Sequence, residues 1–192
     1  MTFLYYVTHA QVHIDPAVPV PRWQLSEIGR GRVLAMLGQP WLGAVRRIIT
    51  SPEAKAVETA RIIADHLRLD IDERESSGEL DRSATGFVPH DRHEQLADAC
   101  FARSNESAGG WETAMAARSR IVDALADVLA GGGENVAVIG HGGVGTLLYC
   151  HLAGEAIDRR HDQPGQGHYF TVDLDRGVPL HTWRPIDQIE PG

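Results

Sequence analysis

The segment Phe3-Leu-Tyr-Tyr-Val-Thr-His9-Ala10 opens the chain with an apolar run that ends on a histidine. A second segment near the other end, Val136-Ala-Val-Ile-Gly-His141-Gly-Gly143, has the same arrangement. Apolar runs without polar alternation are typical of parallel strands that are covered on both faces. Residues just beyond the carboxyl ends of such strands line the crevice in which open α/β sheets bind ligands. The two segments therefore predict two buried strands that bring His9 and His141 to one site.

The rest of the chain alternates between strand and helix patterns, which predicts an α/β fold. A further strand is expected at Arg46-Arg-Ile-Ile-Thr50, and helices over 26–37, 52–67, 94–102, 111–129 and 144–152. Ser26 is a good cap for the first helix, whose apolar face would carry Ile28, Val33, Leu34 and Leu37. Segments 169–174 and 178–183, joined by a turn containing Gly177, predict a hairpin at one edge of the sheet.

Length, composition and charge narrow the class of protein. At 192 residues and 43% apolar, the chain is long enough for one domain with a sizeable core. A net charge of −8 and the lack of a basic cluster disfavour nucleic-acid binding. The apolar start is too short for a membrane span and lacks a basic leader, so we expect a cytoplasmic protein without a membrane partner. Cys100 and Cys150 are expected to be core thiols.

Three motifs in order along the chain resemble those of a known family. They are Thr8-His9-Ala10, Ser51-Pro-Glu-Ala-Lys55-Ala-Val-Glu-Thr59-Ala60 and Gly140-His141-Gly142-Gly143. Together they resemble the histidine phosphatase superfamily, also called the phosphoglycerate mutase-like fold. The resemblance implies a three-layer sandwich with a mainly parallel central sheet flanked by helices. Residues 1–192 would form a single domain, with a small cap-like excursion at about 76–110 over the site.

The resemblance also implies a chemistry, the hydrolysis of phosphomonoesters without a metal or cofactor. His9 would be the nucleophile that forms a covalent phosphohistidine. His141, if protonated, and the backbone N–H groups from Gly142 onward would stabilise the phosphoryl oxygens. Glu79 would supply the proton to the leaving group, with burial raising its pKa, and Asp81 is the alternative donor.

Two positions depart from the family's motifs. Thr8 and Lys55, the only lysine of the chain, stand where the family carries arginines. A hydroxyl and a single ammonium replace two charged bidentate groups, which should weaken phosphate binding. We expect Thr8, Lys55 and Gly142 to bind the phosphate, and Arg82 or Arg22 to supply the missing charge.

Alternative interpretations remain at this stage. The chain could be a phosphatase-like domain that has lost turnover and only binds a ligand. A phosphoglycerate-type mutase is disfavoured, because the sparse excursion is poorly suited to keeping water away from a phosphorylated enzyme. His90 and His93 have a spacing compatible with a metal, but no third ligand with suitable spacing completes a site. The expected partner is a small phosphorylated substrate, and the final hairpin leaves a homodimer open.

Overall fold

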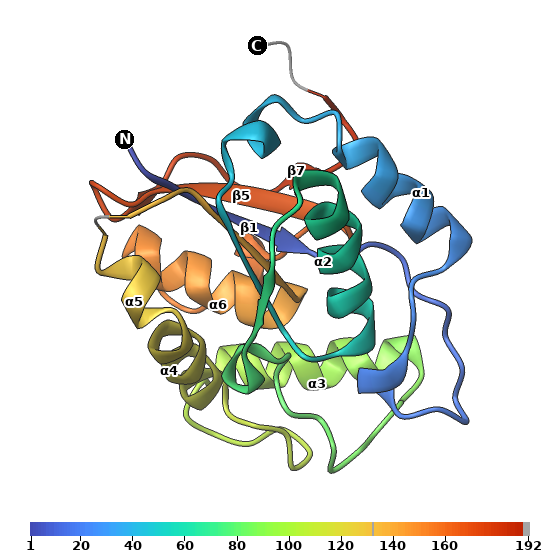
Figure 1. The fold of residues 1–192 in the computed structure, drawn as a ribbon. Helices are drawn as coiled ribbons and strands as arrows, with labels where there is room; N and C mark the ends of the chain where they lie inside the picture. The colour runs from blue at the N-terminus through green and yellow to red at the C-terminus, as the bar shows by residue number, and fades with distance from the viewer. Residues whose placement is uncertain (132, 190–192) are drawn as a thin grey trace.

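The computed structural model describes residues 1–131 and 133–189. Its strands form one mixed sheet in the order β3-β2-β4-β1-β5-β6, with β7 also paired to β5 (Figure 1). The strands are β1 (Phe3–Thr8), β2 (Arg47–Thr50), β3 (Ile71–Glu73), β4 (Val136–Gly140), β5 (His168–Asp173), β6 (Val178–Pro179) and β7 (Arg184–Pro185). Neighbours from β3 to β1 run parallel, whereas β5 is antiparallel to β1, β6 and β7. The predicted α/β class with a mainly parallel sheet is confirmed.

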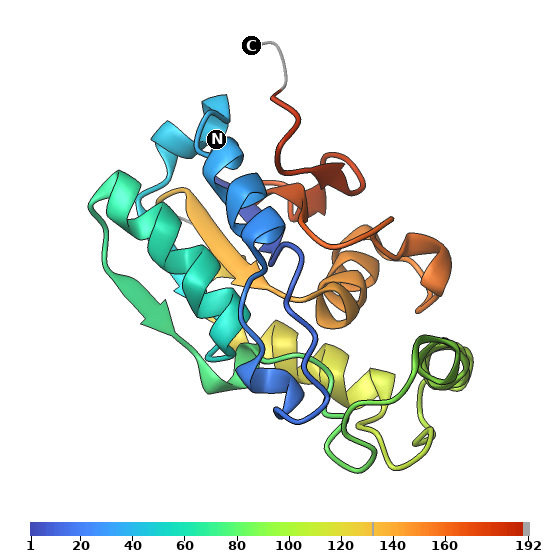
Figure 2. The same cartoon turned by 90° about the vertical axis from the view of Figure 1, so that its right-hand side faces the viewer.

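Helices cover both faces of the sheet (Figure 2). One face carries α1 (Glu27–Met36) and α2 (Ala54–Leu67), and the other side carries α3 (His90–Ala102), α4 (Ala114–Ala124), α5 (Ala126–Leu129) and α6 (Gly142–Ala153). Short 3-10 helices span Val20–Arg22, Pro40–Ala44, Glu75–Ser77 and Arg159–His161. Along β1, Leu4 and Tyr6 pack into one buried cluster, whereas Tyr5 and Val7 pack into the other. Burial on both faces explains the unbroken apolar runs.

The first helix begins as expected, but its buried face is different. Ser26 caps α1, since its hydroxyl accepts the N–H of Gly29 at 3.0 Å. Ile28 and Leu34, predicted on the apolar face, are exposed. Val33 is buried as predicted, and the buried face also carries Gly29 and Met36. A side chain at Gly29 would collide with the backbone of Gln11, so close approach of the preceding loop sets the rotation of the helix.

Other boundaries differ from the predicted ones. The expected helix over 111–129 is interrupted at Leu125, and it starts only after Thr113, whose hydroxyl accepts the N–H of Ala116. The helix expected from residue 52 begins at Ala54, because Ser51 bonds the N–H of Glu53 in the turn before it. The helix expected from 94 begins at His90. Strand β3 was not predicted, since its Asp72 and Glu73 break any apolar run.

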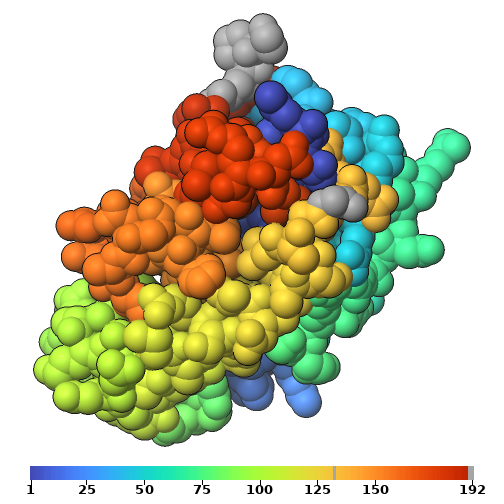
Figure 3. Space-filling model, turned by 90° about the vertical axis from the view of Figure 1, so that its left-hand side faces the viewer, coloured from blue at the N-terminus to red at the C-terminus, as the bar shows by residue number. Residues whose placement is uncertain are grey.

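The start of the chain is hydrogen-bonded to the turn that follows β5. The N–H of Leu174 donates to the carbonyl of Thr2 at 2.9 Å, and Figure 3 shows the N-terminal residues beside the C-terminal hairpin. The predicted hairpin is present, although its second strand is only Val178–Pro179. Cys100 and Cys150 are buried and unbridged. Within the described ranges, no helix has the length and apolar character needed to cross a membrane.

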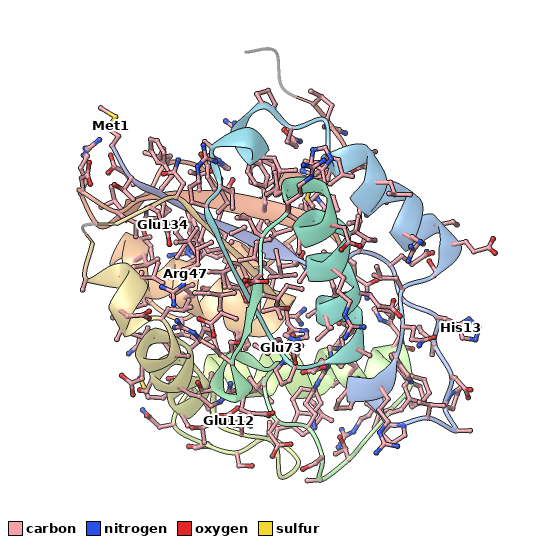
Figure 4. All side chains as sticks on the ribbon, in the orientation of Figure 1. Met1, His13, Arg47, Glu73, Glu112 and Glu134 are labelled. Carbon is pink, nitrogen blue, oxygen red and sulfur yellow. The ribbon has the colours of Figure 1, made fainter. Side chains whose placement is uncertain are left out.

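Ion pairs join β2 to the edge strand β3 and to α5. Arg47 on β2 pairs with Asp72 on β3 at 2.9 Å and with Asp127 on α5 at 3.0 Å. Figure 4 labels Arg47, and it shows His13 pointing away from the body of the molecule. His13 is exposed, in keeping with the absence of a predicted role for it.

Candidate active site

The structure brings the two strand-terminal histidines together. Strands β1 and β4 are adjacent and parallel, with Thr8 opposite Gly140 in the register. His9 and His141 follow these positions, and their ring centroids lie 5.3 Å apart. Both side chains are buried. The carboxyl edge of the sheet therefore presents a pair of imidazoles, as the sequence predicts.

His9 is held as a neutral imidazole. Its Nδ1 lies 2.9 Å from the carbonyl oxygen of Ala10, which can only accept, so Nδ1 carries the proton and Nε2 keeps its lone pair. Burial, with help from the nearby His141, lowers the pKa of His9 to about 3. Since His9 also lines the main cavity, it can act there as a nucleophile.

His141 is fixed at the start of α6 by its neighbours. The buried hydroxyl of Tyr6 donates to the His141 carbonyl at 3.1 Å and accepts its N–H at 3.2 Å. The ring Nε2 lies 2.7 Å from the Ser51 hydroxyl and 3.4 Å from a carboxylate oxygen of Glu53. Burial lowers the pKa of His141, although Glu53 and Glu79 oppose that shift.

The carboxylate of Glu79 lies at the N-terminus of α6. One oxygen accepts the N–H of Gly143 at 3.1 Å, and the other accepts those of Val144 at 3.0 Å and Leu80 at 2.9 Å. Helix N-termini favour negative charge because their N–H groups point outward. A side chain at Gly143 would contact the Glu79 carboxylate at 2.7 Å, so glycine leaves room for it.

The expected rise in the pKa of Glu79 is wrong. Burial by itself would raise that pKa, but the charges of His141 and Arg82 and the N–H of Leu80 outweigh it and lower the pKa. Glu79 is therefore ionised near neutrality and occupies part of the N–H nest expected to hold phosphate. Gly142 lines the cavity beside it.

Lys55 is already paired with an acidic residue. Its ammonium donates to the carbonyl of Val20 at 3.0 Å and forms an ion pair with Glu53. The other oxygen of Glu53 accepts the N–H of Glu79 at 2.9 Å. Burial alone would raise the pKa of Glu53, but the neighbouring His141 and Lys55 lower it to about 2. Lys55 thus lines the cavity with its charge largely balanced.

Thr8 does not face the cavity, contrary to expectation. Its hydroxyl donates to Oε1 of Gln163 at 2.6 Å and accepts the N–H of His168 at 3.0 Å. The short side chain is fully buried between β1 and β5. Gln163, which Thr8 holds, does line the cavity, so a neutral amide stands near Gly142.

The two candidate arginines differ in their position relative to the cavity. Arg82 lines the cavity, with its guanidinium carbon 5.6 Å from the Trp111 ring centroid and a hydrogen bond to His93. Arg22 is exposed on its 3-10 helix and is not among the residues that line the cavity, so its phosphate contact stays a prediction.

Asp81, the alternative proton donor, also lies outside this cavity. It is exposed, and its carboxylate accepts the N–H of Ser83. His90 and His93 line the cavity, but residues 1–131 and 133–189 contain no group of three or more histidine, cysteine or acidic side chains arranged to hold a metal ion.

The cavity has a volume of about 650 Å³ and holds His9, Lys55, Glu79, Arg82 and Gly142 on its walls. The sequence profile of the histidine phosphatase superfamily (branch 1) matches residues 21–179, which is most of the chain. The chain belongs to the histidine phosphatase superfamily. None of the curated proteins matches the sequence.

Solved structures share the fold of this histidine phosphatase superfamily member. A putative alpha-ribazole-5'-P phosphatase from Escherichia coli is 17% identical with a TM-score of 0.77, covering 97% of this chain and 98% of its own. The phosphoserine phosphatase of Entamoeba histolytica, in complex with 3-phosphoglyceric acid, is 16% identical with a TM-score of 0.76, covering 96% and 97%. Mycobacterial glucosyl-3-phosphoglycerate phosphatase with inorganic phosphate is 19% identical with a TM-score of 0.73, covering 96% and 95%.

Sequence reasoning missed two residues at the site of this superfamily member. Glu53 stands within the second motif, two residues before Lys55. This opposite charge so near in sequence could have indicated the ion pair with Lys55. Gln163 gave no signal, because its contact with Thr8 joins residues far apart in the chain.

Proposed function

We propose that this protein is a metal-independent phosphomonoester hydrolase that works through a phosphohistidine on His9. The observation that carries the proposal is His9, which lines a cavity that also holds Glu79 and whose ring lies 5.3 Å from the buried ring of His141. Membership of the histidine phosphatase superfamily supports it, and the three structures of similar fold described above are phosphatases by name. The substrate would be a small phosphorylated molecule.

In the first step, Nε2 of His9 attacks phosphorus while the bond between phosphorus and the ester oxygen breaks. The leaving oxygen takes a proton from Glu79. In the second step, water attacks phosphorus, the N–P bond breaks, and the Glu79 carboxylate takes the proton of the water. The imidazole of His9 is then free for another turnover.

Glu79 must gain a proton before the first step, since its lowered pKa leaves it ionised near neutrality. A phosphomonoester has its second pKa near about 6 and can carry this proton into the site as the monoanion. Inside the cavity, the adjacent phosphoryl charge would shift the proton to Glu79. Arg82, Lys55 and the N–H of Gly142 are the groups proposed to stabilise the phosphoryl oxygens.

Turnover of an aryl phosphate in a buffer containing a metal chelator tests the proposal. We expect product release by the wild-type protein and a phosphorylated protein in rapidly quenched samples, detected by intact mass. Both signals should disappear in His9→Ala and persist in His66→Ala, which removes an exposed histidine on α2. Turnover that survives His9→Ala would contradict the proposal.

The ion pair between Glu53 and Lys55 favours a second candidate, a ligand-binding protein without turnover. A buried carboxylate beside the phosphate site opposes binding of a dianion. If a correctly folded protein releases no phosphate from a broad panel of phosphoesters, this second function is the better one.

A further inference from the structure

The cavity of about 650 Å³ is much larger than a phosphoryl group needs, and it lies within the range of sites that enclose whole small molecules. His9, Lys55, Glu79, Gly142 and Gln163 line its inner end. The remaining space, which we name the outer chamber, would receive the alcohol part of a phosphoester. Its walls therefore decide which esters fit.

Apolar side chains dominate the outer chamber. They come from the proline-rich N-terminal loop and from the segment at about 76–111, and they include Ile14, Trp23, Phe87, Val88, Phe101 and Trp111. The rings of Trp23 and Phe87 meet edge to face with centroids 5.5 Å apart, which joins the two segments across the chamber. Aromatic rings in this geometry form a rigid apolar wall.

Two of these side chains are exposed. Ile14 is 56% exposed and Phe87 is 40% exposed, although both also line the cavity. Burying such surface against a hydrocarbon group is favourable, whereas a polyhydroxylated group would lose hydrogen bonds to water there. The apolar wall therefore favours a hydrocarbon ligand.

Apart from Arg82, which is proposed to bind the phosphoryl group, the arginine of the outer chamber is already balanced. Arg159 forms ion pairs with Glu94 at 2.9 Å, Asp98 at 2.6 Å and Asp162 at 2.7 Å. Of these, Arg159, Glu94 and Asp162 line the chamber. Carboxylates on the wall repel a second anionic group on a substrate, and Arg159 has little charge left to attract one.

We infer that the substrate is a phosphate monoester of an uncharged alcohol bearing an aromatic or similarly bulky hydrocarbon group. This inference rests on the proposed phosphatase function, because it takes the phosphoryl group to lie at His9. It separates this protein from enzymes for phosphorylated sugars or phosphoglycerates, whose alcohols are hydroxylated or carry a carboxylate.

Comparison of alkyl esters tests the inference without differences in leaving-group chemistry. We expect kcat/KM for 3-phenylpropyl phosphate to exceed that for glycerol 3-phosphate and 3-phosphoglycerate by roughly tenfold to a hundredfold. Phe87→Ser should lower the value for the phenylpropyl ester more than that for glycerol 3-phosphate. Leu180→Ser is the matched control, because Leu180 is 50% exposed and lies away from the cavity.

Binding of 3-phenylpropylphosphonate to His9→Ala, measured by calorimetry, separates this inference from the proposed function. The specificity of the outer chamber is supported if His9→Ala binds 3-phenylpropylphosphonate more tightly than glycerol 3-phosphate and Phe87→Ser weakens this preference. If the wild-type protein at the same time hydrolyses none of the esters, the hydrolase proposal is contradicted. Hydrolysis with a preference for 3-phosphoglycerate, or an equal effect of Phe87→Ser on all esters, would overturn the specificity and leave the hydrolase standing.

Discussion

The carboxylate of Glu53 forms a buried ion pair with the ammonium of Lys55, and its second oxygen lies 3.4 Å from Nε2 of His141. The side chains of Glu53 and Lys55 are only 12% and 4% exposed. In the proposed mechanism, an incoming phosphoryl group would therefore compete with Glu53 for the same cation. This competition would make the proposed phosphate site weaker than one whose cation is unpaired.

Glu53→Gln should strengthen anion binding. The amide keeps an oxygen for the N–H of Glu79 but removes the charge, so Lys55 becomes available to the phosphoryl oxygens. We expect the affinity for orthovanadate to rise roughly tenfold, the lower end of what one charge-assisted hydrogen bond contributes. Inhibition of aryl phosphate turnover, or direct calorimetry, measures this affinity.

The control for this substitution is Asp65→Asn, which removes an exposed carboxylate from the same helix. It should leave the vanadate affinity within about twofold, since exposed charges are well screened. A further expected effect of Glu53→Gln is a lower melting temperature that phosphate restores, because ligand binding to the native state stabilises it. Unchanged vanadate affinity would show that Lys55 does not contact the anion.

Lys55→Met should destabilise the fold more than most single substitutions. It leaves the Glu53 carboxylate buried without its cation, which costs about 3–5 kcal/mol for a typical buried pair. Replacing both residues, as Glu53→Leu with Lys55→Met, should recover most of this loss, because neither charge of the pair remains. Urea unfolding of the two single variants and the double variant gives the coupling free energy, and additive losses would contradict the pairing.

The sequence predicts the positions of His9 and His141 well, because both follow strands that are buried on two faces and such strands leave an unbroken apolar signature. The role of Ser26 as the cap of α1 could equally be predicted, since a helix cap depends on residues close together in the sequence. Much of the site chemistry is not local. The hydroxyl of Thr8 turns to Gln163, 155 residues away, and only the folded chain shows this contact.

Glu79 illustrates the same limit. Burial was expected to raise its pKa, and burial alone does act in that direction. The opposing groups reach Glu79 through tertiary contacts, including N–H groups of Gly143 and Val144 that lie 64 and 65 residues further along the chain. The sign of a pKa shift depends on such a balance, so the residue type and its surroundings in sequence could not give it.

The pH dependence of turnover should follow the proton that Glu79 needs. His9, with a pKa of about 3, stays neutral above ~pH 4 and imposes no loss of kcat/KM on the acid side. Above about pH 6 the substrate loses its second proton, and Glu79 is then also deprotonated, so kcat/KM for an alkyl phosphate should fall about tenfold per pH unit.

Glu79→Gln is the variant that checks this assignment. It should lower kcat for an alkyl phosphate by about a hundredfold to ten-thousandfold. It should also remove the part of the fall in kcat/KM above about pH 6 that is due to deprotonation of Glu79. Asp81→Asn, at the exposed neighbour outside the cavity, should keep the wild-type profile. A profile that flattens in Asp81→Asn instead would move the proton donor to Asp81.

Tyr6→Phe should separate the positioning of His141 from its chemistry. The Tyr6 hydroxyl bonds both the N–H and the carbonyl of His141, so its removal leaves two buried backbone groups without that partner. We expect a loss of about 1–3 kcal/mol in the free energy of unfolding, measured with urea, and a lower kcat because the start of α6 is less firmly held. The matched control is Tyr5→Phe, at the preceding residue of β1. The Tyr5 ring packs in the buried cluster on the opposite face of the sheet, so this variant should change kcat little. If Tyr6→Phe lowers stability but leaves kcat at the wild-type value, the hydroxyl supports only the fold, and Ser51 and Glu53 are sufficient to hold the His141 ring.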